Sequence, residues 1–142
     1  MRMCGALVLG LATIGPSYAA CLQSNSRSPD AWAKRINGQA TLIVDGKVIQ
    51  EQDAASKRNA VIQPIVVYKG NARHGAVQMA LPPRDRMFVE HRYEGFSGRL
   101  GERSFLVLYG TAQGYQTNDC TDILVSDPKI RRAIIRHSRR RS

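Results

Sequence analysis

The chain has 142 residues, of which 23% are charged and 43% hydrophobic, and it carries a formal net charge of +10 at pH 7. This length is enough for one compact domain and no more. The positive charge favours an anionic partner. No aromatic residues interleave with the C-terminal arginines, so a stacking platform for nucleic acid is not expected.

Residues 1–20 have the order of an export signal. Arg2 precedes an apolar run from Met3 to Ile14, which is followed by Gly15-Pro16 and several small residues. About twelve apolar residues are too few for a stable membrane-spanning helix, so no transmembrane segment is expected once the signal is removed. The sequence therefore predicts a periplasmic or secreted protein.

The cleavage point sets the mature N-terminus. Cleavage after Ala19 places the small residues Ser17 and Ala19 at the two positions that signal peptidase reads. Cleavage after Ala20 instead places the bulky Tyr18 at the first of them. Because two alanines precede Cys21, a lipid attached to this cysteine is a further alternative.

The chain therefore divides into three parts. We expect a signal peptide over residues 1–19 (alternatively 1–20), a single domain over 20–137 and a basic tail over 138–142. Residues 129–142 contain seven Lys and Arg and no acid. Such an end is either a solvated tail or a contact for an anionic surface. The candidate residues for this contact are Arg139, Arg140 and Arg141.

Two cysteines remain after loss of the signal peptide. Cys4 is removed with it, which leaves Cys21 and Cys120 in an oxidising compartment where disulfides persist. A bridge between them closes a loop of about 100 residues. The three histidines do not have the spacing that a two-cysteine metal site requires. The sequence thus favours a structural disulfide, and no metal or other cofactor is expected.

The mature chain opens with a helix. Ser28 is a good N-cap and Pro29 suits the first helical position. Trp32 and Ile36 follow at helical spacing and are expected to pack against the body of the domain. Asn37-Gly38 is expected to end the helix.

The next segments are typical of strands. Asp45-Gly46 between apolar residues predicts either a hairpin turn or a kink within one long strand, and local reasoning leaves both open. Glu51–Asn59 is polar and turn-like. Val61–Tyr68 is rich in β-branched residues, and Pro64 confines it to an edge or a bulge.

The second half adds more strands and a helix. Gly75–Leu81 and Ser104–Tyr109 are expected to be strands, with a long charged segment between them whose centre is also a weak strand candidate. Tyr115–Leu124 has an extended pattern. Asp127-Pro128 begins a helix with one apolar stripe. That stripe consists of Ile130, Ala133, Ile134 and His137. Five or so short strands with a closing helix predict a small β-barrel.

No catalytic arrangement stands out. Glu90 and His91 are neighbours, so on a strand their side chains point to opposite faces. His74 follows a predicted turn and His137 lies in the basic C-terminal segment. Neither a nucleophile motif nor a phosphate-binding loop is present. An enzyme is therefore not expected.

The order of several short motifs resembles a known group of proteins. These motifs are the strand–Gly–Lys–Val element Leu42–Ile49, then Tyr68-Lys69-Gly70, the strand Gly101–Leu108, and a late cysteine that leads into a final helix over Cys120–Arg136. Together they resemble the bacterial relatives of tissue inhibitors of metalloproteinases, within the netrin-like group of OB-fold domains. The resemblance implies a mainly β, five-stranded OB-like barrel with a short N-terminal helix and a C-terminal helix.

The resemblance also bears on the open choices. It implies that Asp45-Gly46 kinks one long strand, and that Cys21 and Cys120 tie the N-terminal segment to the last strand or helix. The family's usual second cysteine near Cys21 is missing, and Thr121-Asp122 replaces its usual Arg-Thr. In the animal inhibitors the N-terminal cysteine binds the protease zinc. That role falls on Cys21 and requires cleavage after Ala20.

We therefore expect an exported, disulfide-stabilised binding domain whose partner is an unknown protein or envelope component. The alternatives are a metalloprotease inhibitor acting through Cys21 and an anionic-surface binder acting through the tail. The predicted contact surface is the segment 82–103, which combines arginines with aromatic residues. Its candidate residues are Arg84, Arg86, Phe88, Arg92, Tyr93 and Phe96.

Overall fold

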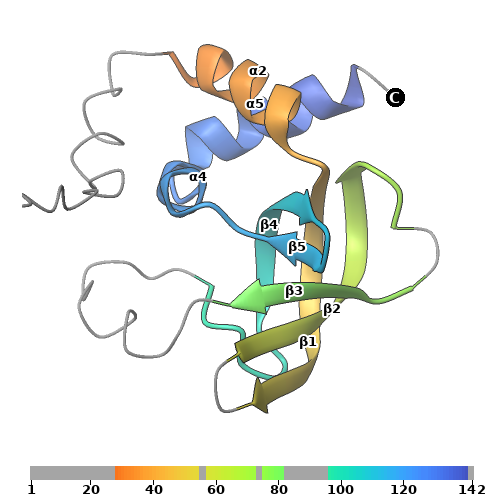
Figure 1. Ribbon diagram of the computed structural model, residues 1–142. Helices are drawn as coiled ribbons and strands as arrows, with labels where there is room; N and C mark the ends of the chain where they lie inside the picture. The colour runs from red at the N-terminus through yellow and green to blue at the C-terminus, as the bar shows by residue number, and fades with distance from the viewer. Residues whose placement is uncertain (1–27, 55–56, 73–74, 82–95, 141–142) are drawn as a thin grey trace, which may run out of the picture.

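The computed structural model describes residues 28–54, 57–72, 75–81 and 96–140. Five strands close into a small barrel in the order β1-β2-β3-β5-β4, and the helices lie together over one end of it (Figure 1). In chain order the elements are α2 (Pro29–Gln39), β1 (Leu42–Ala54), β2 (Lys57–Lys69), β3 (Val77–Leu81), β4 (Arg103–Thr111), β5 (Gly114–Gln116), α4 (Asp119–Val125) and α5 (Pro128–Arg139). The predicted fold class, a small OB-like barrel with terminal helices, is confirmed.

β1 is one long strand and not a hairpin. Its pairing with β2 shifts register between Asp45 and Gly46 and then continues to Ala54. The kink that the resemblance implied is therefore correct, and the segment Glu51–Asn59, expected to be turn-like, is mostly strand. Gly46 is needed at the kink because a Cβ there would lie 2.4 Å from Cγ2 of Ile62 on β2.

Both faces of the sheet are covered where the helices lie. The side chains of Leu42, Val44, Leu106 and Leu108 fill the barrel interior. Between them, Ile43, Phe105 and Val107 point the other way and pack against the helices. Because successive strand residues alternate between faces, a strand buried on both sides has an unbroken apolar sequence. This explains the apolar runs in β1 and β4.

The predicted helix starts are correct at both ends of the domain. The side chain of Ser28 accepts a hydrogen bond of 3.2 Å from the Ala31 amide, with Pro29 in the first turn. The carboxylate of Asp127 accepts one of 2.8 Å from the Lys129 amide at the start of α5. Trp32 is buried as expected, with 6% of its surface exposed.

The segment before α5 differs from expectation. Tyr115–Leu124 was predicted to be extended, but only β5 is strand and the chain turns into α4 at Asp119. The side chain of Asn118 caps this helix by accepting a hydrogen bond of 3.2 Å from the Thr121 amide. Tyr109 on β4 contacts the buried Thr121 through a hydroxyl–hydroxyl distance of 2.7 Å, so this interaction joins α4 to the barrel.

Candidate anion-binding site

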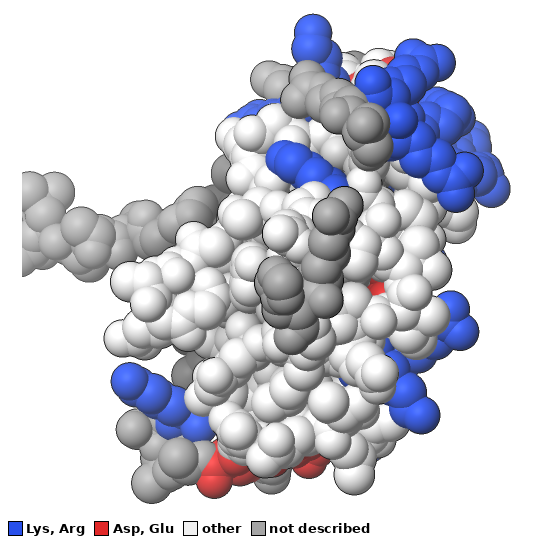
Figure 2. Space-filling model, turned by 90° about the vertical axis from the view of Figure 1, so that its right-hand side faces the viewer, with Lys and Arg blue, Asp and Glu red and all other residues white. Residues whose placement is uncertain are grey.

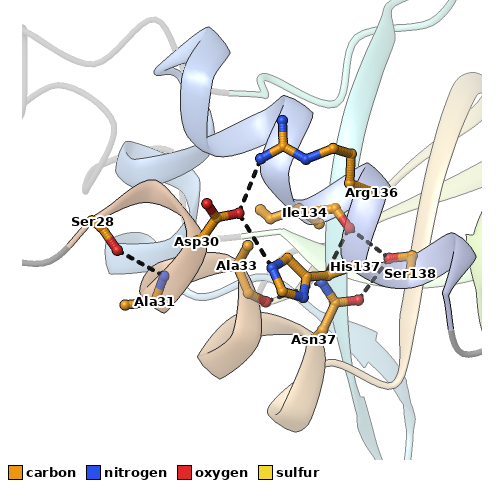
Figure 3. Close-up of polar contacts among 9 residues, drawn as sticks. All are labelled: Ser28, Asp30, Ala31, Ala33, Asn37, Ile134, Arg136, His137 and Ser138. Atoms are coloured by element: carbon orange, nitrogen blue, oxygen red, sulfur yellow. Dashed lines mark hydrogen bonds and ion pairs between the residues drawn. The ribbon is translucent and has the colours of Figure 1, made fainter.

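A buried asparagine joins the first and last helices of the domain (Figure 3). Asn37 on α2 is 1% exposed, and its amide nitrogen donates to the carbonyl oxygens of Ala33 at 3.0 Å and Ile134 at 3.1 Å. Its amide oxygen lies 2.6 Å from the hydroxyl of Ser138. A buried amide is tolerated when its hydrogen-bonding capacity is used, and here it fixes α5 against α2.

The helices also meet through an exposed carboxylate. Asp30 in the first turn of α2 accepts a hydrogen bond from Arg136 at 3.0 Å, and Nε2 of His137 lies 3.3 Å from the same oxygen (Figure 3). The hydrogen bond from Arg136 holds the pKa of Asp30 below its usual value. Since Asp30 is at the surface, this contact orients the arginine more than it stabilises the fold.

The outer face of α5 carries a basic stripe, which we define as Arg132, Arg136 and Arg139. These arginines follow each other at spacings of four and three, so they lie on one side of the helix over about 10 Å. All three are exposed, and the buried residues Ile130, Ala133, Ile134 and Ser138 lie on the opposite side. Figure 2 shows Lys and Arg side chains gathered at this end of the molecule.

The charges of the stripe are poorly compensated by the helix itself. The first turn of α5 contains no acidic residue, and the described acid that pairs with the stripe is Asp30 of α2. Like charges at i and i+4 destabilise a helix by about 0.2–0.5 kcal/mol per pair. The helix dipole offsets this only in the last turn, at Arg136 and Arg139. Arg132 lies outside that turn, so neither an acidic residue in the first turn of α5 nor the helix dipole stabilises its exposed charge.

Arg131 shows what a structural arginine on the same helix does. Its Nε and Nη2 atoms donate to the carbonyl oxygen of Val125 at 3.2 and 3.0 Å. Its guanidinium also lies 5.6 Å from the ring centroid of Phe105 on β4. This residue therefore fastens α5 to α4 and the barrel, whereas the stripe points to solvent.

The Tyr68-Lys69-Gly70 motif holds the helical layer on the barrel. The hydroxyl of Tyr68 donates to the Asp45 carboxylate at 2.7 Å. The ammonium of Lys69 donates to the carbonyl oxygens of Asn37 and Ala40 at the C-terminal end of α2. A cation there also interacts favourably with the helix dipole. The Tyr68 contact joins β2 to β1, and the Lys69 contacts fix α2, and through it the basic stripe, relative to β2.

Gly70 completes the motif. Its φ of +87° is in the left-handed region, and a Cβ would lie 2.5 Å from the carbonyl oxygen of Thr41. Only glycine fits this backbone conformation and this close approach without strain. The motif that supported the family resemblance thus has a structural explanation of its own.

Most of the predicted contact segment lies outside the described residues. This applies to Arg84, Arg86, Phe88, Arg92 and Tyr93, and likewise to His74, Glu90 and His91. Phe96 is described, and it packs half-buried against the interior of the barrel. It is therefore part of the fold's packing and not a freely exposed contact residue.

The chain just after Phe96 is fastened to the barrel by two carboxylates. Glu102 accepts hydrogen bonds from the Ser97 hydroxyl at 2.6 Å and from the Arg99 amide at 3.2 Å. Glu51 on β1 accepts one of 2.5 Å from the Leu100 amide. The described end of the predicted contact segment is thus a fixed turn.

The predicted tail residues have different outcomes. Arg139 belongs to α5 and Arg140 is its C-cap, both exposed, while Arg141 lies outside the described residues. The predicted boundary at 137/138 falls inside the helix, because Ser138 is buried against Asn37. Sequence reasoning assigned the anion contact to the tail and missed Arg132. The sequence does indicate that Arg132 is exposed, since it lies on the side of the helix opposite the predicted apolar stripe.

Of the two cysteines predicted to form a disulfide, the structure describes one. Cys120 is half-buried at the second residue of α4, whereas Cys21 lies outside the described residues. The Cys21–Cys120 disulfide and the zinc-binding role of Cys21 therefore stay predictions. Within the described ranges, no group of three or more His, Cys, Asp or Glu side chains gathers as a metal site would require.

Comparison with known proteins offers no relative from which a function can be transferred. No family model matches the chain, and no curated protein or solved structure is significantly similar to it. The likeness to the netrin-like group accordingly stays a prediction from short motifs. Among the helices of the described residues, none is long and apolar enough to cross a membrane.

Proposed function

We propose that this protein is an exported binding domain that attaches to phosphate-bearing lipid surfaces through the basic stripe of α5. Export is inferred from residues 1–20, and a Cys21–Cys120 disulfide is part of the proposal. The observation that carries it is the stripe itself: three arginines on one side of a helix whose other side is buried. Arg140 adds a fourth exposed charge at the end of the helix.

The stripe suits a flat lipid surface for two reasons. Arginine presents a planar fork of donors that matches phosphate oxygens, and side chains on a packed helix lose little further freedom on binding. The apolar residues of α5 are committed to the core, so the helix has no free apolar face to insert into a bilayer. Binding is therefore electrostatic, with about 1 kcal/mol for each basic residue near the surface.

The nucleic-acid alternative has less support. Platforms for single-stranded nucleic acid combine a basic groove with aromatic residues on which bases stack. The outer side of α5 carries arginines without aromatic residues, since Pro128–Arg139 contains no Phe, Tyr or Trp. A phosphate surface without bases fits this composition better.

Vesicle sedimentation tests the proposal. The test variant is Arg132→Gln/Arg139→Gln/Arg140→Gln, which leaves the contact between Arg136 and Asp30 in place. The control is Lys47→Gln/Lys57→Gln/Arg103→Gln, which removes the same charge from exposed positions on the barrel strands. Partitioning is measured on vesicles of phosphatidylglycerol and phosphatidylcholine, and on phosphatidylcholine alone.

The stripe variant is expected to lose roughly a hundredfold in partitioning to the anionic vesicles, from about 1 kcal/mol per residue. The barrel control should lose several-fold at most, and wild-type binding should weaken as salt rises. Equal losses in the two variants would show that net charge alone drives binding. No binding of wild type at low salt would overturn the proposal.

A further inference from the structure

Two side chains of α5 contact the same oxygen atom of Asp30 on α2. Nη2 of Arg136 donates to Oδ1 of Asp30 at 3.0 Å, and Nε2 of His137 lies 3.3 Å from that atom. Figure 3 shows the guanidinium and the imidazole both directed at this carboxylate from neighbouring positions of the helix. One carboxylate oxygen therefore links Arg136, a residue of the basic stripe, to a histidine that does not belong to the stripe.

Of these three groups, the histidine is the one whose charge changes near neutral pH. Histidine is the side chain whose charge change ordinarily falls between about pH 5 and 8. Asp30 stays ionised over this range, because the hydrogen bond from Arg136 lowers its pKa from the usual value of 3.8. The guanidinium of arginine does not lose its proton in proteins. The net charge of the three groups is therefore set by the imidazole of His137.

The charged residues around His137 leave Asp30 as its ionic partner. One turn further along α5 lies Arg140, and the elements packed against this helix carry Lys34 and Arg35 on α2, Asp119 and Asp122 on α4, Lys69 on β2 and Arg103 on β4. The charges of Arg35 and Asp122 act on Tyr109 of β4. Among the described residues, Asp30 is the charged side chain within hydrogen-bonding distance of the His137 ring. A proton on this ring therefore acts first on the contact between α2 and α5.

We propose that His137 makes lipid binding pH-dependent, because its protonation offsets the charge of Asp30 and releases Arg136 to bind lipid phosphate. This inference rests on the proposed function of the basic stripe. When the imidazole is neutral, the charges of Asp30 and Arg136 cancel, and the uncompensated charges of the stripe are those of Arg132 and Arg139. The imidazolium donates from both ring nitrogens and competes for Oδ1 as a charged donor. Its position in the last turn of α5 also favours a positive charge.

Vesicle sedimentation at two pH values tests this role. Partitioning to phosphatidylglycerol vesicles is measured at low salt, at about pH 7.5 and about pH 5.5, on either side of the ordinary histidine range. The wild type is expected to bind about fivefold more tightly at the acid pH, from one more positive charge near the surface. His137→Gln should bind equally at both, at the level of the wild type at neutral pH. The control His74→Gln/His91→Gln removes the other histidines of the chain and should keep the wild-type response.

A second measurement follows the change of partner without vesicles. The NMR signal of the Arg136 Nε–H group should move as the His137 ring titrates in the wild type, and should stay in place in His137→Gln. Asp30→Asn removes the carboxylate for which the two side chains compete. This variant should bind vesicles at neutral pH as tightly as the wild type does at acid pH.

The outcomes separate this role from lipid binding itself. Wild-type binding that is equal at the two pH values would refute the role of His137 and leave binding by the basic stripe standing. A pH response that persists in His137→Gln, or an Arg136 signal that does not move in the wild type, would refute it as well. If the wild type does not bind at either pH, both proposals are wrong.

Discussion

Asn37 and Ser138, which are 101 positions apart in the sequence, are joined in the interior of the helical layer by a hydrogen bond of 2.6 Å. Both side chains are buried, at 1% and 3% exposure. They fix the crossing of α2 and α5, and therefore the direction in which the basic stripe faces. The orientation of the basic stripe thus depends on a hydrogen bond in which no residue of the stripe takes part.

Asn37→Ala is expected to lower the free energy of unfolding by about 1–3 kcal/mol, because it leaves buried groups of Ala33, Ile134 and Ser138 without this partner. Gln39→Ala, at an exposed position of the same helix, should change it by less than about 0.5 kcal/mol. Urea denaturation measures both. Similar losses in the two variants would mean that the buried amide does not hold the helices together.

Lys69→Met should cost about 1.5–3 kcal/mol, since a charged donor to two carbonyl oxygens of α2 is lost. Lys57→Met removes the same charge from an exposed position at the start of β2 and serves as the control. Amide hydrogen exchange should become faster in α2 of the Lys69 variant. Unchanged exchange in α2 would contradict the role assigned to this lysine.

Gly46→Ala is expected to destabilise the protein by about 1–3 kcal/mol through overpacking, because its Cβ would meet Cγ2 of Ile62 at 2.4 Å. Ile62→Ala removes that methyl group. The double variant should therefore be little less stable than Ile62→Ala alone. If the two losses add, the clash with Ile62 is not the reason for the glycine.

Burial raises the pKa of Tyr68 and of Tyr109 above 10, and at Tyr68 the hydrogen bond to Asp45 acts in the same direction. The unfolded chain releases these protons at about pH 10, whereas the folded protein holds them to higher pH. The contribution to stability is therefore full below pH 10 and is lost as pH rises through the folded pKa values.

Thermal melts across this range should show the loss in wild type, and Tyr68→Phe/Tyr109→Phe should flatten the curve. Tyrosinate absorbance of the folded protein provides an independent titration. A double variant that keeps the full alkaline slope would assign the effect to other groups.

Cys21→Ser, Cys120→Ser and the double variant should lower the free energy of unfolding by similar amounts, since each removes one predicted bond. The chain-entropy model gives an upper value of about 4.7 kcal/mol for a loop of about 100 residues. Reductant should abolish the difference from wild type. Peptide mapping that finds these cysteines unlinked in the exported protein would refute the bond.

Local chemistry made some elements of this fold predictable. Ser28 and Asp127 are capping residues directly before a proline, and the helices start where this pattern places them. The same reasoning failed at Asn118, because the strand-like residues before it suggested that the strand continued. Local reasoning left Asp45-Gly46 open between a turn and a kink, and the register shift there shows the kink that the family resemblance implied.

The candidate site was predictable only in part. The basic end of the chain is visible in the sequence, and the apolar stripe of α5 determines which arginines face outward. The contacts that orient them come from α2, and no local pattern relates Asp30 to Arg136 or Asn37 to Ser138.

The contact of α2 with α5 also governs how the protein reaches its native state. Asn37 donates to the carbonyl oxygen of Ile134, 97 positions further on, and the apolar cluster that covers Ile43 of β1 is complete only when α5 has been synthesised. Contacts between distant parts of a sequence carry a large loop-closure cost and slow folding. The domain is therefore expected to complete its folding only after its whole length is available, which is compatible with the export proposed from residues 1–20.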